Sequence, residues 1–164
     1  MLTYQIRGTD RLLNSLDRLE LSLKDFRPLF NEASRLIYEF EKEAFASEGA
    51  SSRVGKWKPL TANYARWKEK KAPGKPILEF SGALKRSLTR PNARGSVRRI
   101  TEEELIVGTQ IPYAVFHQTG TRKMVARPPF ALTKQQEKAI AKILRDGLAA
   151  FVKRAGFTVT EGRG

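Results

Sequence analysis

The chain has 164 residues, with 31 lysine and arginine residues against 17 aspartate and glutamate residues, a formal net charge of +14. It contains no cysteine and one histidine, His117, which excludes disulfides, thiolate metal sites and a structural zinc cluster. No apolar run approaches the roughly 20 residues of a membrane span, and the N-terminus lacks the apolar segment of a signal peptide. We therefore expect one soluble domain, residues 1–164, that folds in a reducing compartment.

The positive charge is concentrated in the middle of the chain. Residues 53–99 hold 14 basic and 2 acidic residues, a net +12, whereas residues 1–52 carry −2 and residues 100–164 carry +4. A basic concentration of this kind favours nucleic acid or an acidic protein surface as the partner. A solvated loop that keeps the protein soluble accounts for the charge equally well.

The N-terminal third predicts a strand followed by two helices. Residues 2–7 alternate apolar and polar side chains, as a half-buried strand does. Thr9 is a suitable N-cap for a first helix that ends near residue 20, and Asp25 for a second helix over about 25–47. Pro28 is tolerated because it lies in the first turn. Apolar side chains at spacings of three and four predict that one face of the second helix packs against the core: Phe26, Leu29, Phe30, Ala33, Ile37, Phe40 and Ala44.

Residues 48–76 predict an extended basic loop or arm, within which Thr61 could cap a short helix that ends before the break at 72–76. Its cations surround aromatic side chains, a pattern that can bind single strands by stacking. We favour the alternative that the aromatic residues anchor the arm to an apolar surface of this subunit or its neighbour, and that the arm orders on assembly. The anchors are Trp57, Tyr64 and Trp67, and the basic surface is Arg66, Lys68, Lys70, Lys71 and Lys75.

Residues 77–88 predict a short helix that begins near Ser81, and a helix cap explains this serine better than a catalytic role because no histidine lies near it in sequence. Residues 97–100 and 105–107 predict an antiparallel hairpin. The turn between these strands carries the triplet 102–104 of glutamates, whose three consecutive side chains cannot all face one cation. A solvated turn is the better interpretation of the triplet.

Residues 105–132 combine a strand end, a short helix and a stiff apolar segment. Pro112 suits the first turn of the helix, and Gly120 suits a left-handed C-cap. The run from Arg127 to Phe130 predicts an extended segment, because each proline fixes its own φ and restricts the residue before it. We expect His117 and Gln118 to fix this loop through structural hydrogen bonds, against Arg127 and the two prolines.

The C-terminal part predicts a long helix that ends near Gly156. Thr133 with Gln136 three residues on is typical of a capping box. Residues 157–159 could form a final strand, and 161–164 a frayed tail. Together these elements predict an α+β fold in which a small antiparallel sheet packs against two or three amphipathic helices, chiefly the second helix and the C-terminal helix.

Three blocks, in order over roughly residues 50–132, resemble the signature of the phage tail-completion proteins, also called the virion morphogenesis family. They are G-K-W-K-P-L-T at 55–61, I-L-E-F-S-G-A-L-K-R-S at 77–87, and P-Y-A-V-F-H-Q-T-G-T followed by A-R-P-P-F. Phe80 departs from the pattern, which more usually has a polar residue there. The blocks supply these candidate interaction residues: Trp57, Pro59, Leu60, Ser81, Gly82, Leu84, Tyr113, His117, Gln118, Gly120, Arg127, Pro128 and Phe130.

The resemblance implies a structural component of the phage neck. Such a protein forms a ring, expected to be a six-fold homo-oligomer, that completes the tail, joins it to the head and lets DNA pass. It implies neighbouring neck and tail-terminator proteins and genomic DNA in the lumen as partners, and a place in the virion after assembly in the host cytoplasm. We expect no enzyme, cofactor, metal or membrane. The alternative, which the charge alone suggests, is a nucleic-acid-binding module of a phage or prophage.

Overall fold

The computed structural model describes residues 9–157, and six helices and one two-stranded sheet lie in that range. In chain order they are α1 (Thr9–Leu23), α2 (Arg27–Ala46), α3 (Ala62–Lys71), α4 (Ala83–Thr89), β1 (Ser96–Ile100), β2 (Leu105–Thr109), α5 (Ala114–Thr119) and α6 (Lys134–Arg154). The predicted α+β class is confirmed. The strand expected at 2–7, the tail at 161–164 and most of the strand expected at 157–159 lie outside the described residues.

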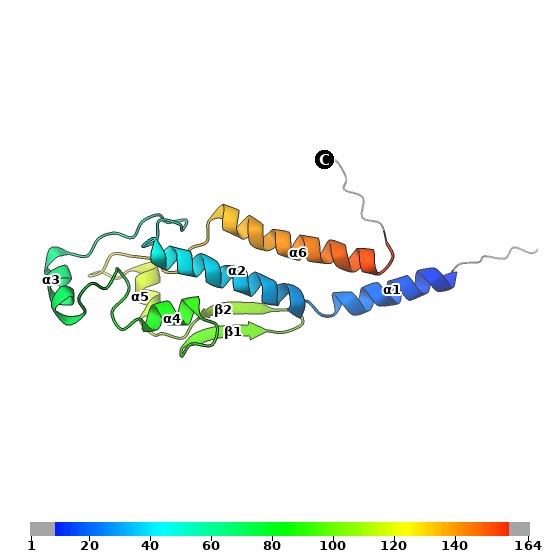
Figure 1. The fold of residues 1–164 in the computed structure, drawn as a ribbon, viewed down its shortest axis with the longest axis horizontal. Coiled ribbons are helices and arrows are strands. Elements are labelled where there is room, and N and C mark those ends of the chain that lie inside the picture. Colours follow the sequence, from blue (N-terminus) through cyan, green and yellow to red (C-terminus); the bar gives the residue numbers. More distant parts are fainter. Residues whose placement is uncertain (1–8, 158–164) are drawn as a thin grey trace, which may run out of the picture.

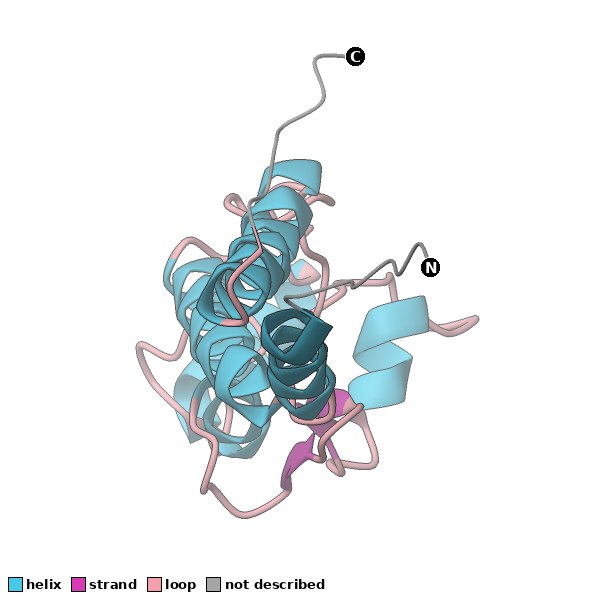
Figure 2. Ribbon diagram, turned by 90° about the vertical axis from the view of Figure 1, so that its right-hand side faces the viewer, coloured by secondary structure: helices cyan, strands magenta, loops and turns pink. Residues whose placement is uncertain are grey.

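Helix α2 is the central element of an elongated arrangement (Figure 1). Helix α6 packs along one side of α2, while α4 and the hairpin of β1 and β2 pack on the other. Viewed from the end where α1 lies, the two strands run along one edge of the helices (Figure 2). The hairpin was expected to pack against the C-terminal helix as well, but its main neighbours are α2 and α4, because α2 lies between the hairpin and α6.

The contact between α2 and α6 depends on a glycine in the middle of α6. A Cβ added at Gly147 would lie 2.2 Å from the Cδ2 atom of Leu29 on α2. The missing side chain therefore lets the two helices approach closely enough for Leu29 to be buried. Near the start of α2, the rings of Phe26 and Phe151 extend this apolar contact, with their centroids 6.4 Å apart.

The face of α2 opposite Leu29 carries buried polar side chains, which the apolar stripe in the sequence does not predict. Ser34 accepts a hydrogen bond from Nε of Arg98 at 3.1 Å, and the hydroxyl groups of Tyr38 and Ser96 lie 3.2 Å apart. Between Tyr38 and the core lies Glu41, buried with its Oε2 atom unpaired within the described range. The helix thus joins α6 through apolar contacts and the hairpin through hydrogen bonds.

The start of α2 differs from the prediction. Phe26, not Asp25, occupies the N-cap position, and it makes no side-chain capping bond. Asp25 still satisfies the first turn, because its Oδ1 atom accepts from the backbone N–H of Arg27 at 2.9 Å. Pro28 lies in the first turn as predicted. The carboxylate of Asp25 therefore caps the helix from the residue before the N-cap, and not from the N-cap position itself.

The hairpin forms as predicted, with Ser96 paired to Thr109 and Ile100 paired to Leu105 in an antiparallel register. Thr101 closes the turn, since its hydroxyl accepts from the backbone N–H of Glu104 at 3.0 Å. The glutamates at 102–104 are all exposed. The triplet is a solvated turn, as the sequence suggested.

Two of the shorter helices begin later than predicted. Gly82, with φ of 75°, is the N-cap of α4, and the exposed Ser81 only accepts from the backbone N–H of Ala83 at 3.3 Å. Pro112 lies in the turn before α5, whose N-cap is Tyr113. In both places the residue that was expected in the first turn of the helix, Ser81 or Pro112, lies instead in a turn before the helix.

The ends of α5 and α6 are closer to the prediction. Gly120 is the C-cap of α5 with a φ of 75°, although its ψ of 178° lies outside the left-handed helical region. Thr133 and Gln136 form the predicted capping box, with bonds of 3.1 Å and 2.8 Å between their side chains and backbones. Both helix ends follow from residues close together in the sequence.

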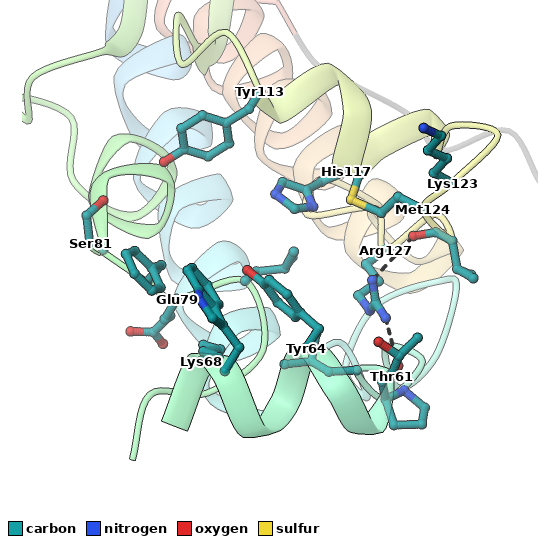
Figure 3. Close-up of a pocket in the computed structure, with 17 residues that line it drawn as sticks. Thr61, Tyr64, Lys68, Glu79, Ser81, Tyr113, His117, Lys123, Met124 and Arg127 are labelled. Carbon is teal, nitrogen blue, oxygen red and sulfur yellow. Dashed lines mark hydrogen bonds between the residues drawn. The ribbon is translucent and has the colours of Figure 1, made fainter. Parts of the chain in front are cut away.

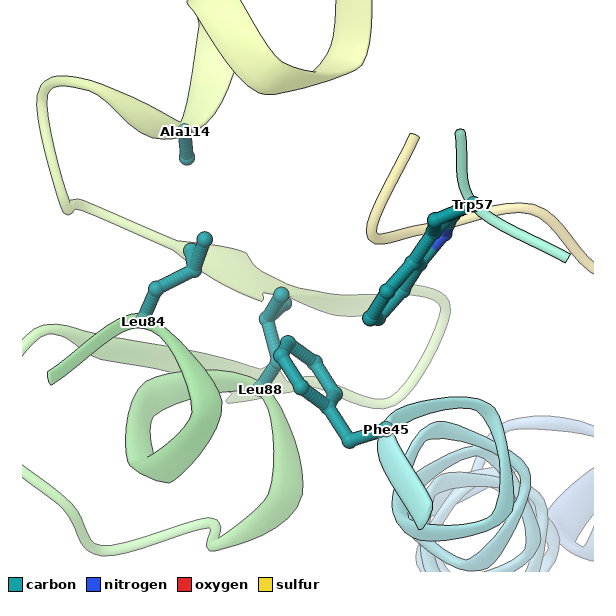
Figure 4. Close-up of a cluster of buried hydrophobic side chains, with 5 residues drawn as sticks. All are labelled: Phe45, Trp57, Leu84, Leu88 and Ala114. Atoms are coloured by element: carbon teal, nitrogen blue, oxygen red, sulfur yellow. The ribbon is translucent and has the colours of Figure 1, made fainter. Parts of the chain in front are cut away.

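The apolar core lies at the end of the molecule away from α1. Phe45, Trp57, Leu84, Leu88 and Ala114 pack together there (Figure 4), joined by the partly buried Ile77, Leu78, Ile111 and Phe130. The ring of Trp57 meets that of Phe45 edge-on at 5.3 Å. This cluster unites α2, α4 and α5 with the segment before α3.

Glu41 makes the stability of the fold depend on pH. Burial raises the pKa of Glu41 from 4.5 to about 8. Between these values the folded chain keeps a proton that the unfolded chain has lost, so the free energy of unfolding falls as the pH rises and levels off above the folded pKa. The expected slope is about 1.4 kcal/mol per pH unit. Glu41→Gln is expected to remove it in urea titrations between about pH 5 and 8.

The matched control is Glu43→Gln, because Glu43 lies on the same helix with its side chain exposed. This control is expected to keep the slope of the wild type. An unchanged slope in Glu41→Gln would show that Glu41 does not govern the pH dependence.

Candidate functional site

A pocket of about 640 Å³ opens beside α3, between that helix and α5 (Figure 3). It brings together residues from all three sequence blocks and from the arm. Those among the predicted site residues are Pro59, Leu60, Tyr64, Trp67, Lys68, Ser81, Gly82, Tyr113, His117 and Arg127. Its other lining residues include Leu78, Phe80, Met124 and Val125. The pocket is therefore the place where segments distant in sequence meet.

Arg127 connects two of the segments that line this pocket. Its guanidinium is buried and donates to the carbonyl oxygens of Lys58 at 2.6 Å and Pro59 at 2.7 Å. Its backbone N–H donates to the carbonyl of His117 at 2.8 Å. Among the side chains that the structure describes, no carboxylate pairs with this charge. The side chain of Arg127 thus binds the arm, and its backbone N–H binds α5.

Trp57 attaches the arm at a second point, since its indole N–H donates to the carbonyl of Pro128 at 3.0 Å. Gly49 has a φ of +88° and passes so close that an added Cβ would lie 2.6 Å from the Trp57 ring. Trp57 is therefore the buried anchor that the sequence predicted.

The extended segment after Arg127 is also held by Gln118. The side-chain amide of Gln118 donates to the carbonyl of Phe130 at 2.9 Å, and its Oε1 atom accepts from the backbone N–H of Phe130 at 3.3 Å. These paired bonds fix Pro128 and Phe130 against α5. Leu84 lies beneath them in the core.

Tyr64 and Trp67 are not buried within this chain, unlike Trp57, and the expectation that they dock on a neighbouring subunit stays a prediction. They form a stack with Phe80, in which Tyr64 and Trp67 lie 5.4 Å apart and Trp67 and Phe80 lie 5.6 Å apart, with interplanar angles of 25° and 9°. The three side chains are 46%, 47% and 47% exposed. Phe80 was singled out only as a departure from the family pattern, because nothing local to residue 80 indicates that α3 folds back over it.

Lys68 was expected on the basic surface but is only 5% exposed. Its ammonium group donates to the carbonyl oxygens of Lys75, at 2.8 Å, and Pro76. Burial lowers the pKa of Lys68, and the negative charges of Glu48, Glu79 and Glu69 oppose that shift. Lys68 therefore closes the loop after α3, because its ammonium joins two successive carbonyl groups of that loop, and the Pro76 carbonyl also accepts from the backbone N–H of Glu79 at 3.1 Å.

The other cations predicted for the basic surface are exposed, namely Arg66, Lys70, Lys71 and Lys75. Arg66 donates to the side chain of Asn63 at 2.7 Å. The positive surface of the arm is consequently formed by the outer face of α3 and the turn that follows it.

The ring of His117 does not make the hydrogen bond that was expected. Its Nδ1 atom is buried without a partner in the described part of the chain, and its ring lies edge-on to that of Tyr113 at 5.9 Å. Burial, and then the charge of Arg127, lower the pKa of His117 below 6.5. The neutral ring is a wall of the pocket, and the backbone carbonyl, not the side chain, contacts Arg127.

The chemistry of this pocket suits binding. Its walls are mainly aromatic and aliphatic, and Glu79 is the one acidic residue among the described lining residues. Glu79 already pairs with Lys85 at 2.6 Å. The charges of Lys68 and Arg127 are taken up by backbone carbonyls, which leaves Lys123 as the exposed cation of the lining.

The described side chains include no group of three or more His, Asp or Glu that is placed to hold a metal ion. The helices of the same range include none that is long and apolar enough to cross a membrane.

Comparison with protein families gives one match, in which the model of the phage virion morphogenesis family covers residues 8–149. No curated protein and no solved structure gives a significant match. The matched range contains the three sequence blocks, the arm and every residue that lines the pocket.

Arg127→Lys tests the tie between the arm and α5. A lysine ammonium cannot reproduce the fork that serves both carbonyls, so we expect the free energy of unfolding to fall by about 1–3 kcal/mol. Arg122→Lys, in the exposed turn before Met124, is the control and is expected to stay within about 0.5 kcal/mol of the wild type. Urea titration of both variants measures the difference. Equal midpoints for the two variants would contradict the assigned role of Arg127.

Proposed function

We propose a neck role for this chain, which belongs to the phage virion morphogenesis family. In this proposal it is a structural, non-catalytic protein that forms a ring, completes the tail, helps to join the tail to the head and lets DNA pass. Its place is the tail or neck of the virion, after assembly in the host cytoplasm. The family match over residues 8–149 is the observation that carries the proposal.

The site geometry supports a binding role for the three sequence blocks. The blocks converge on one pocket whose buried cations are satisfied by carbonyl groups and whose histidine lacks a carboxylate partner. Catalysis by acid–base chemistry needs titratable groups that converge on one reacting atom. The pocket offers instead a fixed apolar surface, as a subunit interface requires.

The distribution of charge supports a position beside DNA or an acidic neighbouring ring. The net +12 of residues 53–99 is presented in part by Lys70, Lys71 and Lys75 on the arm. Arm and α1 lie at opposite ends of the molecule (Figure 1). Copies placed around a closed ring, for which we propose six-fold symmetry, would repeat this positive end around the axis.

The charge also supports the alternative, a nucleic-acid-binding module. Such a module binds DNA tightly by itself, with an affinity that falls steeply as salt rises. Filter binding of the purified chain across a salt series separates the two functions. A ring component whose cations face a protein neighbour is expected to bind DNA weakly at physiological salt.

Inactivation of the gene in the phage that carries it tests the proposed function directly. We expect full heads and separate, unfinished tails under the electron microscope, with joined particles restored when the intact chain is supplied. Joined, infectious particles at the normal level without the chain would overturn the proposal.

Lys70→Glu with Lys71→Glu tests the role of the arm. Both residues are exposed, so the fold is expected to stay intact while heads and tails fail to join. Circular dichroism checks the fold, and counts of joined particles check the function. Lys68→Glu is a different case, because a buried carboxylate facing carbonyl groups should destabilise the arm itself.

Lys134→Glu with Lys138→Glu is the matched control for this double variant, since it reverses the same charge on exposed positions of α6. We expect these particles to join normally. If the arm variant also joined normally, the arm would be a solubilising loop.

A further inference from the structure

Apart from Val54, the exposed large apolar side chains among the described residues gather at two separate places. One group surrounds the pocket and α5, and consists of Tyr64, Trp67, Phe80, Tyr113, Val115, Phe116 and Val125. The other lies on α1 and consists of Leu16, Leu21 and Leu23. Figure 1 shows α1 and α3 at opposite ends of the molecule. Apolar surface concentrated in this way marks interaction sites.

Helix α1 is only partly covered by its own chain. Its main contact is with α6. Leu16 and Leu23 are seven residues apart and so lie on the same face, and they are 45% and 40% exposed. Leu21 is 68% exposed. An amphipathic helix of 15 residues in this state presents a free apolar face.

The pocket is the complementary surface. Its volume of about 640 Å³ can take several aliphatic side chains, and its walls are the aromatic stack, His117 and Met124. Lys123 stands in the lining and is exposed, whereas Asp17 is exposed next to Leu16 on α1. Arg18 is exposed as well, but it lies two residues after Leu16 and so towards the opposite face of α1. The charges beside the two apolar surfaces therefore have opposite signs, as expected of surfaces that meet.

We propose that α1 of one copy of this chain docks its face of Leu16 and Leu23 into the pocket of a second copy. This inference rests on the proposed ring and names the surfaces that close it. Because the two surfaces differ and lie at opposite ends, the contact is head to tail. A heterologous contact of this kind repeats from subunit to subunit and closes into a ring when the rotation permits.

The aromatic stack suits this partner better than single-stranded nucleic acid. A base needs the free face of an aromatic ring. In the stack, Trp67 has Tyr64 on one side and Phe80 on the other, so a base could reach only the outer rings of Tyr64 and Phe80. The ammonium of Lys68 and the guanidinium of Arg127, both in the pocket lining, are bound to carbonyl groups and are not free for phosphates.

The chain has no cysteine, which makes disulfide trapping a clean test. One preparation carries Leu16→Cys on α1 and another carries Val125→Cys at the pocket. The full-length chains are mixed and oxidised, and the products are separated on a non-reducing gel. We expect a heterodimer in the mixture and no dimer from either variant alone, because each surface meets only the other.

Two controls define specificity. Asn14→Cys replaces Leu16→Cys, since it is exposed two residues earlier and therefore on the opposite face of α1. Val54→Cys replaces Val125→Cys, since it is an exposed valine that does not line the pocket. Docking holds the paired thiols at a high effective concentration, so the heterodimer should exceed either control by about tenfold or more.

The same pair of cysteines in one chain is then tested in assembled particles. A ladder of covalent oligomers larger than dimers supports the head-to-tail contact. Joined particles that give no ladder, or dimers from Leu16→Cys alone, overturn the contact while the neck function stands. Leu23→Cys, on the same face, replaces Leu16→Cys if that variant assembles poorly. Loss of the gene without any effect on tails overturns the function instead.

Discussion

The pocket depends on one buried guanidinium. Arg127 is bonded to the carbonyl groups of Lys58 and Pro59 through its side chain and to His117 through its backbone. Removal of these bonds would leave two backbone carbonyls and a charge without partners in a buried place, which is costly. The arm, α5 and the Pro128–Phe130 segment are therefore positioned together. Trp57 and Gln118 add hydrogen bonds to the same segment from either side.

Two buried cations at this end of the molecule are paired with neutral groups. Lys68, like Arg127, donates to backbone carbonyls instead of a carboxylate. The pairing of Lys68 fixes the turn after α3. In the pocket lining, the charges of Lys68 and Arg127 are bound to carbonyl groups and are not available to a partner. The strongly basic segment is thereby divided into cations that build the arm and cations, such as Lys70 and Lys71, that face outwards. Only the second group is free to meet DNA or an acidic protein.

The two ends of the molecule differ because different elements cover the two faces of α2. Its apolar face is covered by α6 and its polar face by the hairpin, with Glu41 buried between Tyr38 and Phe45. Helix α6 covers α1 only in part, and Leu16, Leu21 and Leu23 of α1 stay exposed. At the other end, α3 folds over the pocket and exposes its aromatic stack. A molecule with two different open ends is suited to head-to-tail assembly.

The sequence by itself determined the α+β class, the hairpin, the capping box of Thr133 and Gln136, and the family to which the three blocks belong. These signals are local, because they arise from backbone dihedral angles and from bonds between residues a few positions apart. Only the tertiary structure decided that Lys68 is buried, that Trp67 stacks on Phe80 and that the Oε2 atom of Glu41 has no hydrogen-bond partner among the described residues. Burial depends on which distant segment covers a side chain, and no periodicity within one helix records that.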